Sequence, residues 1–230
     1  MTLRKALWLT PALLYALFVL WYTELGGPLT AAEIDGFVAQ MTEQGGEPET
    51  IARLEQFFRE DTGRQFLMLN AIDMAEHPSE VDGAPPDADA DMLMGLYMEH
   101  MIVELLRRGC HPVVLGTAVS PALDLVGIDE AEHWTDGALF RYRSRRDLMA
   151  IAVHPEMGKR HAFKLAALDK TIAYPIETTF YLGDLRLLLG LLSLCFAAVM
   201  DATLPNANTG SAAGRYGLRG WCPSESSPLS

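Results

Sequence analysis

Two uninterrupted apolar stretches lie near the ends of the chain, and the first is residues 6 to 22. It contains no charged side chain and follows Arg4 and Lys5. As a helix it would be about 25 Å long, close to the thickness of the hydrocarbon core of a bilayer. A cleaved signal peptide is the alternative, but this stretch ends in the interfacial aromatic pair Trp21-Tyr22 rather than in small residues. We therefore expect residues 1–22 to form an N-terminal membrane anchor.

The second apolar stretch, residues 187 to 200, is too short to cross a bilayer by itself. It reaches that length only if the segment 180–202 forms one helix with Asp184 and Arg186 at its edge, where an arginine can extend to the headgroups. We predict a second transmembrane helix over 180–202. The alternative is an interfacial or buried amphipathic helix.

The positions of the basic residues predict an orientation. After Arg4 and Lys5 the next basic residue is Arg53. Because cytoplasmic loops are rich in Lys and Arg, we expect a cytoplasmic N-terminus and a central region outside, which in a bacterium is the periplasmic side of the inner membrane. The tail 203–230 is rich in Gly, Ser and Pro, and we expect it to be disordered.

Helix signals dominate residues 23–62, which we interpret as a helical linker. Thr30-x-x-Glu33 is a capping box that predicts a helix to about Glu43. Pro48 suits the first position of a second helix, whose apolar residues fall on one face.

Residues 63–179 alternate between strand and helix patterns. We predict strands at 65–74, 111–125, 137–143 and 171–178, and helices at 89–108, 144–153 and 155–170. This is the βαββαβ order of the ferredoxin-like α+β fold, here flanked by N-terminal and C-terminal transmembrane helices. The fold has helices on one face of its antiparallel sheet and leaves the other face bare. A second copy could cover that face and enclose a cavity, so we expect a homodimer.

Three segments carry a resemblance to a known group of proteins: DTGRQFLMLNAIDM, RRGCHPVVLGTAV and ALFRYRSRRDLMAIAVHPEMGKRHAFKLAALDKTIAYPIE. Over roughly residues 30 to 178 the chain resembles membrane-anchored bacterial proteins of unknown function related to the DUF1330 and EthD-like dimeric α+β barrels. The resemblance implies a ferredoxin-like fold and dimerisation. It implies no particular reaction, because related barrels include cofactor-free monooxygenases, haem-degrading enzymes, decarboxylating types and plain ligand binders.

Charge and motif content exclude several functional classes. The formal charge is −12, from 30 acidic and 18 basic residues, so a surface that neutralises nucleic-acid phosphates is not expected. The three cysteines are far apart in the sequence, which favours neither a disulfide framework nor a zinc ribbon. GxSxG, HExxH, P-loop and GxGxxG-helix motifs are absent, and we expect no cofactor.

The predicted strand 137–143 offers a candidate anion site. Arg141 and Arg143 alternate with apolar residues, so we expect both on the bare face of the sheet, where a guanidinium pair could bind a carboxylate or phosphate. The alternative is that they are solvated or pair with the acid-rich first half of the chain. Other candidate ligand-binding residues are Asn70 in the first strand, Tyr97 in the next helix and Lys164 in the last helix.

The histidines are the candidate general bases. His111 opens a strand and His161 lies on the last helix, although a lone histidine is more often a structural group. His100 and Glu104, four residues apart on one helix face, could supply two metal ligands. No third ligand stands at a recognised spacing, so we predict no metal site.

Three functions fit these features. The favoured one is a membrane-tethered dimeric domain that binds a small anionic or amphiphilic molecule, with catalysis left open. The second is a cofactor-independent monooxygenase or isomerase-like enzyme, with His111 or His161 as base and arginines to stabilise an enolate-like charge. The third is a non-catalytic structural or protein-interaction module at the membrane. A cavity lined by Asn70, Tyr97, His111 and Arg141 would favour the first two.

Overall fold

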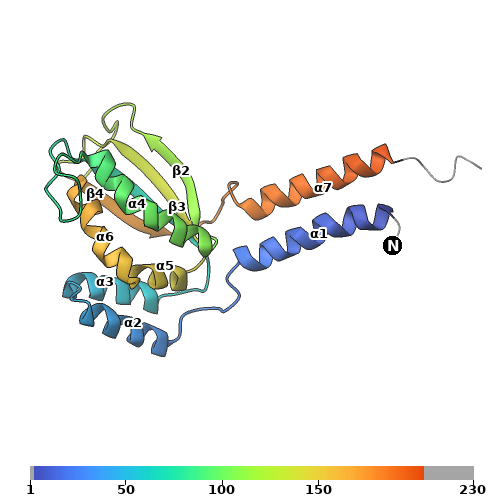
Figure 1. Cartoon of the computed structure of the whole chain (residues 1–230), viewed down its shortest axis with the longest axis horizontal. Coiled ribbons are helices and arrows are strands. Elements are labelled where there is room, and N and C mark those ends of the chain that lie inside the picture. Colours follow the sequence, from blue (N-terminus) through green and yellow to red (C-terminus); the bar gives the residue numbers. More distant parts are fainter. Residues whose placement is uncertain (1–2, 205–230) are drawn as a thin grey trace, which may run out of the picture.

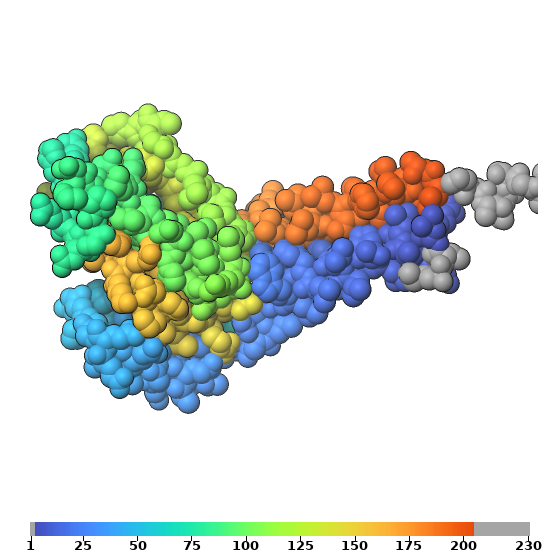
Figure 2. Space-filling view, viewed as in Figure 1, coloured from blue at the N-terminus to red at the C-terminus, as the bar shows by residue number. Residues whose placement is uncertain are grey.

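The computed structural model describes residues 3–204 and shows an α+β domain from which two helices project side by side (Figures 1 and 2). In chain order the elements are α1 (Leu3–Tyr22), α2 (Ala31–Glu43), α3 (Pro48–Arg59), β1 (Phe66–Met74), α4 (Ala90–Arg107), β2 (His111–Thr117), β3 (Asp136–Tyr142), α5 (Arg145–Ala152), α6 (Pro155–Ala166), β4 (Leu168–Ile176) and α7 (Leu185–Thr203). The expected disordered tail lies outside the described residues from residue 205 onward.

The four strands form one antiparallel sheet in the order β2-β3-β1-β4. In the β1–β3 pair, Phe66 lies opposite Tyr142 and Met68 opposite Phe140, so these four side chains share a face. They pack in the main core with residues of α4, α5 and α6, which lie on that side of the sheet (Figure 1). The prediction of an α+β fold with a four-stranded antiparallel sheet is therefore confirmed.

The opposite face of the sheet is apolar and largely open. By the same register it carries Leu69, Leu139, Tyr174 and Ile172, together with Val114 of β2. Val114, Ile172 and Tyr174 are 52%, 40% and 47% exposed. Apolar side chains gathered on one sheet face are stabilised when another layer covers them.

Four element boundaries differ from the predictions. The second apolar helix, predicted over 180–202, begins only at Leu185 with Asp184 as its N-cap, and β4 begins at Leu168 instead of residue 171. The strand predicted at 111–125 ends at Thr117, because its pairing with β3 runs out at Asp136 and the chain continues as an exposed loop through Pro121, which has no N–H to donate. The helix predicted to reach residue 170 ends at Ala166, because Leu168 already pairs with β1 as the first residue of β4.

Helices α2 and α3 pack on α5 rather than extending as a spacer. Ile34, Phe37 and Phe58 form a buried cluster against apolar residues of α5. The predicted capping box is confirmed: the Glu33 backbone N–H donates to Thr30 Oγ1 at 3.3 Å, and the Thr30 N–H donates to Glu33 Oε2 at 2.8 Å.

Helices α1 and α7 form an antiparallel pair that we call the hairpin. The Tyr15 hydroxyl donates to the backbone oxygen of Arg186 at 2.9 Å near the domain, and Arg4 forms an ion pair with Asp201 at 3.0 Å at the far end. The helices have 20 and 19 residues, or about 30 and 28 Å, and many of their apolar side chains are exposed. Figure 2 shows the hairpin projecting from the domain. Both are long and apolar enough to cross a membrane by length and composition.

Candidate functional site

A polar cavity of about 310 Å³ lies where the hairpin joins the domain. We call it the junction cavity. It is bordered by the segment after α1, the segment before β1, the end of β3, the segment after β4 and the start of α7. Its lining residues are Thr23, Glu24, Gly63, Arg64, Gln65, Arg141, Arg143, Glu177, Thr178 and Arg186. Four arginines and two glutamates therefore line this cavity at the point where two apolar helices leave the domain.

Arg141 is fully buried beneath the end of α1. Its guanidinium carbon lies 3.5 Å from the centre of the Tyr22 ring, and its N–H groups donate to the backbone oxygens of Tyr22 and Gly109 and to Gln65 Oε1. Burial lowers the pKa of Arg141. Within the described residues no carboxylate forms an ion pair with this guanidinium, and its positive charge is stabilised by carbonyl dipoles, by the face of the Tyr22 ring and by a longer-range attraction to Asp184.

Arg143 and Arg186 have acidic partners. Arg143 binds Asp147 through two hydrogen bonds of 2.7 and 2.9 Å, which raise the pKa of Arg143, and it also donates to the backbone oxygen of Trp21 at 3.0 Å. Arg186 pairs with Asp184 at 2.5 Å. These two cations hold the ends of the hairpin against the domain and are largely neutralised.

Arg64 differs from the other three arginines of the cavity. Its side chain is exposed and, within residues 3–204, forms no hydrogen bond and no ion pair. The sequence analysis missed Arg64, although a signal was available. In an antiparallel β1–β3 pair, residues just before Phe66 must lie beside those just after Tyr142, which places Arg64 near Arg143.

His111, a candidate base, is held by two hydrogen bonds. Its Nδ1 lies 2.9 Å from the backbone oxygen of Pro112, and its Nε2 lies 2.6 Å from the hydroxyl of Tyr22. The carbonyl can only accept, so Nδ1 carries the proton and Nε2 accepts from the tyrosine. His111 thus belongs to the same structural contact as Tyr22 and Arg141, and it does not line the junction cavity.

The remaining predicted residues lie on the helix-covered side of the sheet. Asn70 shares the face of Met68, and its side-chain amide donates to the backbone oxygen of that residue at 3.1 Å. Lys164 has its ammonium 5.7 Å from the ring centre of Tyr97. Burial raises the pKa of Tyr97 to about 12 and lowers that of Lys164. His161 is exposed on α6. The four residues proposed to line one cavity are therefore divided between the two faces of the sheet.

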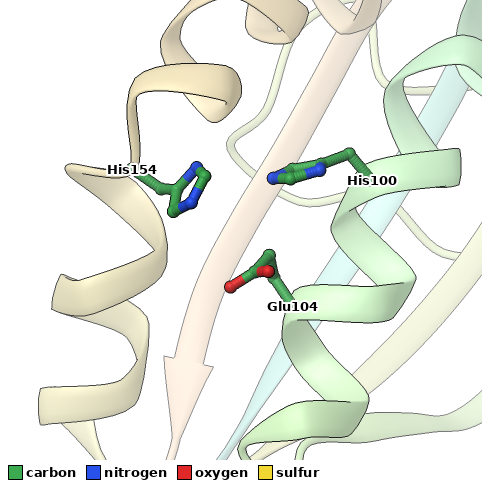
Figure 3. Close-up of side chains that lie close together, drawn as sticks. All are labelled: His100, Glu104 and His154. Carbon is green, nitrogen blue, oxygen red and sulfur yellow. The ribbon is translucent and has the colours of Figure 1, made fainter.

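Three residues that could hold a metal ion come together elsewhere. His100 and Glu104 of α4 lie beside His154, which precedes α6 (Figure 3). The sequence analysis identified His100 and Glu104 as possible metal ligands. His154 is distant in the chain, and only the packing of α6 on α4 brings it to them.

Comparison with known proteins gives structural similarity only. No protein-family model and no curated protein matches the chain. A protein of unknown function from Rhodopseudomonas palustris is 17% identical over 59% of this chain and 95% of that chain, with a TM-score of 0.47. A dimeric ferredoxin-like protein of unknown function from Jannaschia sp. CCS1 is 17% identical over 50% and 99%, with a TM-score of 0.30. A dimeric ferredoxin-like protein of unknown function from Bacteroides fragilis NCTC 9343 is 10% identical over 50% and 96%, with a TM-score of 0.29. The relationship to the DUF1330 group stays a prediction.

Proposed function

We propose that this protein is a membrane-tethered domain that binds a small anionic or amphiphilic molecule in the junction cavity. The observation that carries the proposal is the position of the cavity, because four arginines line it at the point where two apolar helices leave the domain. A molecule with a negatively charged head and an apolar tail would find both surfaces there.

The tether is supported by where the charges of the hairpin lie. Residues 6–22 of α1 and 187–200 of α7 contain no charged side chain, while Arg4 and Asp201 mark one end and Arg186 the other. As helices, these uncharged stretches are about 25 and 21 Å long, so the charged side chains at their edges would have to extend to the headgroups on either side of a hydrocarbon core. We place the domain on the periplasmic side of a bacterial inner membrane, with both outer ends of the hairpin in the cytoplasm.

Retention of α1 is supported by the burial of its last residue. Tyr22 is 1% exposed, its backbone oxygen accepts from Arg141, and its hydroxyl bonds His111. Cleavage after this helix would expose Arg141 and remove two of its contacts. A signal peptide has no need of such contacts, whereas a permanent anchor that fixes the position of the domain does.

Anion binding is supported by the charge balance of the cavity. Glu177 pairs with Arg145, outside the lining, at 3.1 Å, and Glu24 lies 3.5 Å from Arg146 and 3.9 Å from Arg143 of the lining. The lining itself holds four arginines against two glutamates, and Arg141 forms no ion pair within residues 3–204. Arg64 is exposed and has its donors available for a phosphate or carboxylate.

A homodimer is supported by the open apolar face of the sheet. The exposed side chains of Val114, Ile172 and Tyr174 would be buried by the same face of a second copy. Native mass spectrometry of the full chain in detergent should give a dimer for the wild type and a monomer for Ile172→Glu. Leu165→Glu changes a more exposed apolar residue on α6 and should stay dimeric. A monomeric wild type would contradict this part of the proposal.

Binding is tested with a defined probe. The full chain in dodecyl maltoside is titrated with dihexanoyl phosphatidic acid, and with dihexanoyl phosphatidylcholine as the zwitterionic comparison, while thermal unfolding is followed. The anionic lipid should raise the Tm of the wild type and of Arg53→Gln, an exposed arginine on α3. It should raise the Tm of Arg64→Gln much less. Equal stabilisation of all three proteins would show that the junction cavity does not bind the headgroup.

A further inference from the structure

We propose that His100, Glu104 and His154 form a binding site for one divalent transition-metal ion of the zinc class. One ligand atom from each residue lies within 4.8 Å of the other two. Figure 3 shows the two imidazoles facing each other across the gap between α4 and the start of α6, with the carboxylate directed into the same space. The site is on the helical layer of the domain and is independent of the junction cavity.

The spacing on α4 presents two of the ligands together. Residues four apart on a helix lie on the same face, so His100 and Glu104 point toward α6 from successive turns. His154 is fixed at the opposite side, because it is the N-cap residue of α6 and Pro155 sets the direction of the first turn. The three donors therefore come from two packed elements rather than from a mobile loop.

The polar atoms of the cluster favour an ion over a purely structural contact. His100 Nε2 is buried and has no hydrogen-bond partner among the described residues. A buried nitrogen in this state loses its hydration without compensation, which native structures rarely tolerate without a water or an ion. The rings of His100 and His154 lie 5.0 Å apart between centroids and form no hydrogen bond with each other. A metal ion between them would satisfy both.

The other contacts of Glu104 leave room for a metal. Glu104 is 2% exposed, and its carboxylate forms ion pairs with Arg107 and Arg108. Arg108 is half-buried and would remain as the group that orients the carboxylate, as outer partners of metal ligands commonly do. The side chain of Arg107 is 70% exposed and can turn away into solvent, which frees Glu104 Oε1.

The contact of His154 is a weak competitor. Its Nδ1 accepts from the backbone N–H of Glu156 at 3.3 Å, which is long for a hydrogen bond. Coordination through either ring nitrogen would end this hydrogen bond. If the ion binds Nδ1, that atom can no longer accept from Glu156, and if the ion binds Nε2, Nδ1 carries the proton of the neutral ring and cannot accept either. The loss is confined to one long contact at the first turn of α6.

The donor set selects the class of ion. Two imidazole nitrogens and one carboxylate suit Zn²⁺ and its neighbours Co²⁺ and Ni²⁺, whereas Mg²⁺ and Ca²⁺ prefer sites made of oxygen atoms. Three protein ligands leave a fourth position for water or another small ligand. The bound ion would also join α4 to α6 and so stabilise the helical layer.

The test uses the full chain, purified in detergent without a polyhistidine tag and freed of metal with EDTA. Zn²⁺ is titrated in competition with a chromophoric chelator, and Co²⁺ is titrated while its visible absorption is followed. We expect one Zn²⁺ per chain, a visible Co²⁺ spectrum and a higher Tm with Zn²⁺ but not with Mg²⁺. His154→Ala should weaken Zn²⁺ binding by at least about tenfold.

His133→Ala is the matched control, because His133 is exposed in the loop before β3 and is not one of the three residues of the cluster. It should bind Zn²⁺ like the wild type. Circular dichroism shows whether each variant is folded, and His100→Gln provides a second variant should His154→Ala fail to fold. The proposal is overturned when the wild type binds no stoichiometric Zn²⁺, or when His133→Ala loses as much affinity as the folded cluster variants.

Discussion

Replacement of Arg141 by leucine tests whether the end of α1 is a structural part of the domain. The guanidinium holds the backbone oxygens of Tyr22 and Gly109 and the side chain of Gln65, and it stacks on the ring of Tyr22. Leucine keeps much of the apolar volume but supplies none of these donors. The variant would leave two backbone carbonyls and an amide oxygen without this partner.

The expected loss of stability is about 3 kcal/mol. Hydrogen bonds to charged groups contribute about 1.5 to 3 kcal/mol each, and a buried cation–π contact adds up to about 2 kcal/mol. Part of this total is offset, because burial opposes the charge of Arg141, as the lowered pKa of the guanidinium shows. For a domain of about this size, 3 kcal/mol corresponds to a decrease in Tm of about 6 to 12 °C.

The assay is thermal unfolding of the full chain in detergent, followed by near-ultraviolet circular dichroism. Arg64→Leu is the matched control, because it makes the same substitution at a neighbouring arginine that is exposed and forms no hydrogen bond in residues 3–204. Its Tm should stay within about 2 °C of the wild type. Equal Tm values for the two variants would refute the structural role assigned to Arg141.

Three further predictions follow from local contacts. Tyr22→Phe removes the hydroxyl that bonds His111 and should lower the Tm by about 2 to 4 °C, the effect of about 1 kcal/mol, in the same assay. The hydrogen bond from Arg146 lowers the pKa of Glu33 from 4.5 to about 2, so this stabilisation is complete above about pH 4.5 and is lost as the pH falls toward 2. In urea titrations Glu33→Gln should therefore be less stable than the wild type at pH 6, and the difference should vanish near pH 2; a difference independent of pH would contradict this. Burial raises the pKa of Cys110 to about 12, so iodoacetamide should modify this thiol only after unfolding, whereas the exposed Cys195 can react in the native protein. Peptide mapping identifies the modified cysteine, and rapid modification of Cys110 in the native protein would show that the core is open.

Much of the fold was predictable because its signals are local. The capping box at Thr30, the proline that opens α3 and the alternation along β3 each act within a few residues, and the elements they predict are present. The ends of β2 and α6, which were predicted wrongly, depend on distant partners. β2 ends where its neighbour β3 begins, and α6 ends because Leu168 and Lys170 pair with β1. The pairing of distant strands cannot be read from the hydrophobic pattern of either segment alone.

The candidate site was only partly accessible from the sequence, for the same reason. Alternation along β3 correctly indicated that Arg141 faces away from the helices, since it shares the register of Leu67 rather than that of Phe66. It could not indicate that Tyr22 covers this arginine, because that contact joins residues 119 positions apart in the chain. The place of His154 beside His100 likewise depends on how α6 packs on α4.

At the junction, hydrogen bonds connect the hairpin to the sheet. Arg143 donates to the backbone oxygen of Trp21, and Arg186 donates to Thr23 Oγ1 and Gln65 Oε1. The first and last helices of the described chain are thus bonded to the ends of β1 and β3. This arrangement fixes the junction cavity relative to the hairpin.

The central claim is that α1 and α7 cross a lipid bilayer as a hairpin. Alkaline carbonate extraction of membranes from bacteria that express the full chain tests it most directly, because this wash strips proteins held only by surface contacts. We predict that the protein remains in the membrane pellet and is released only by detergent. Recovery of the intact chain in the carbonate supernatant would contradict the account.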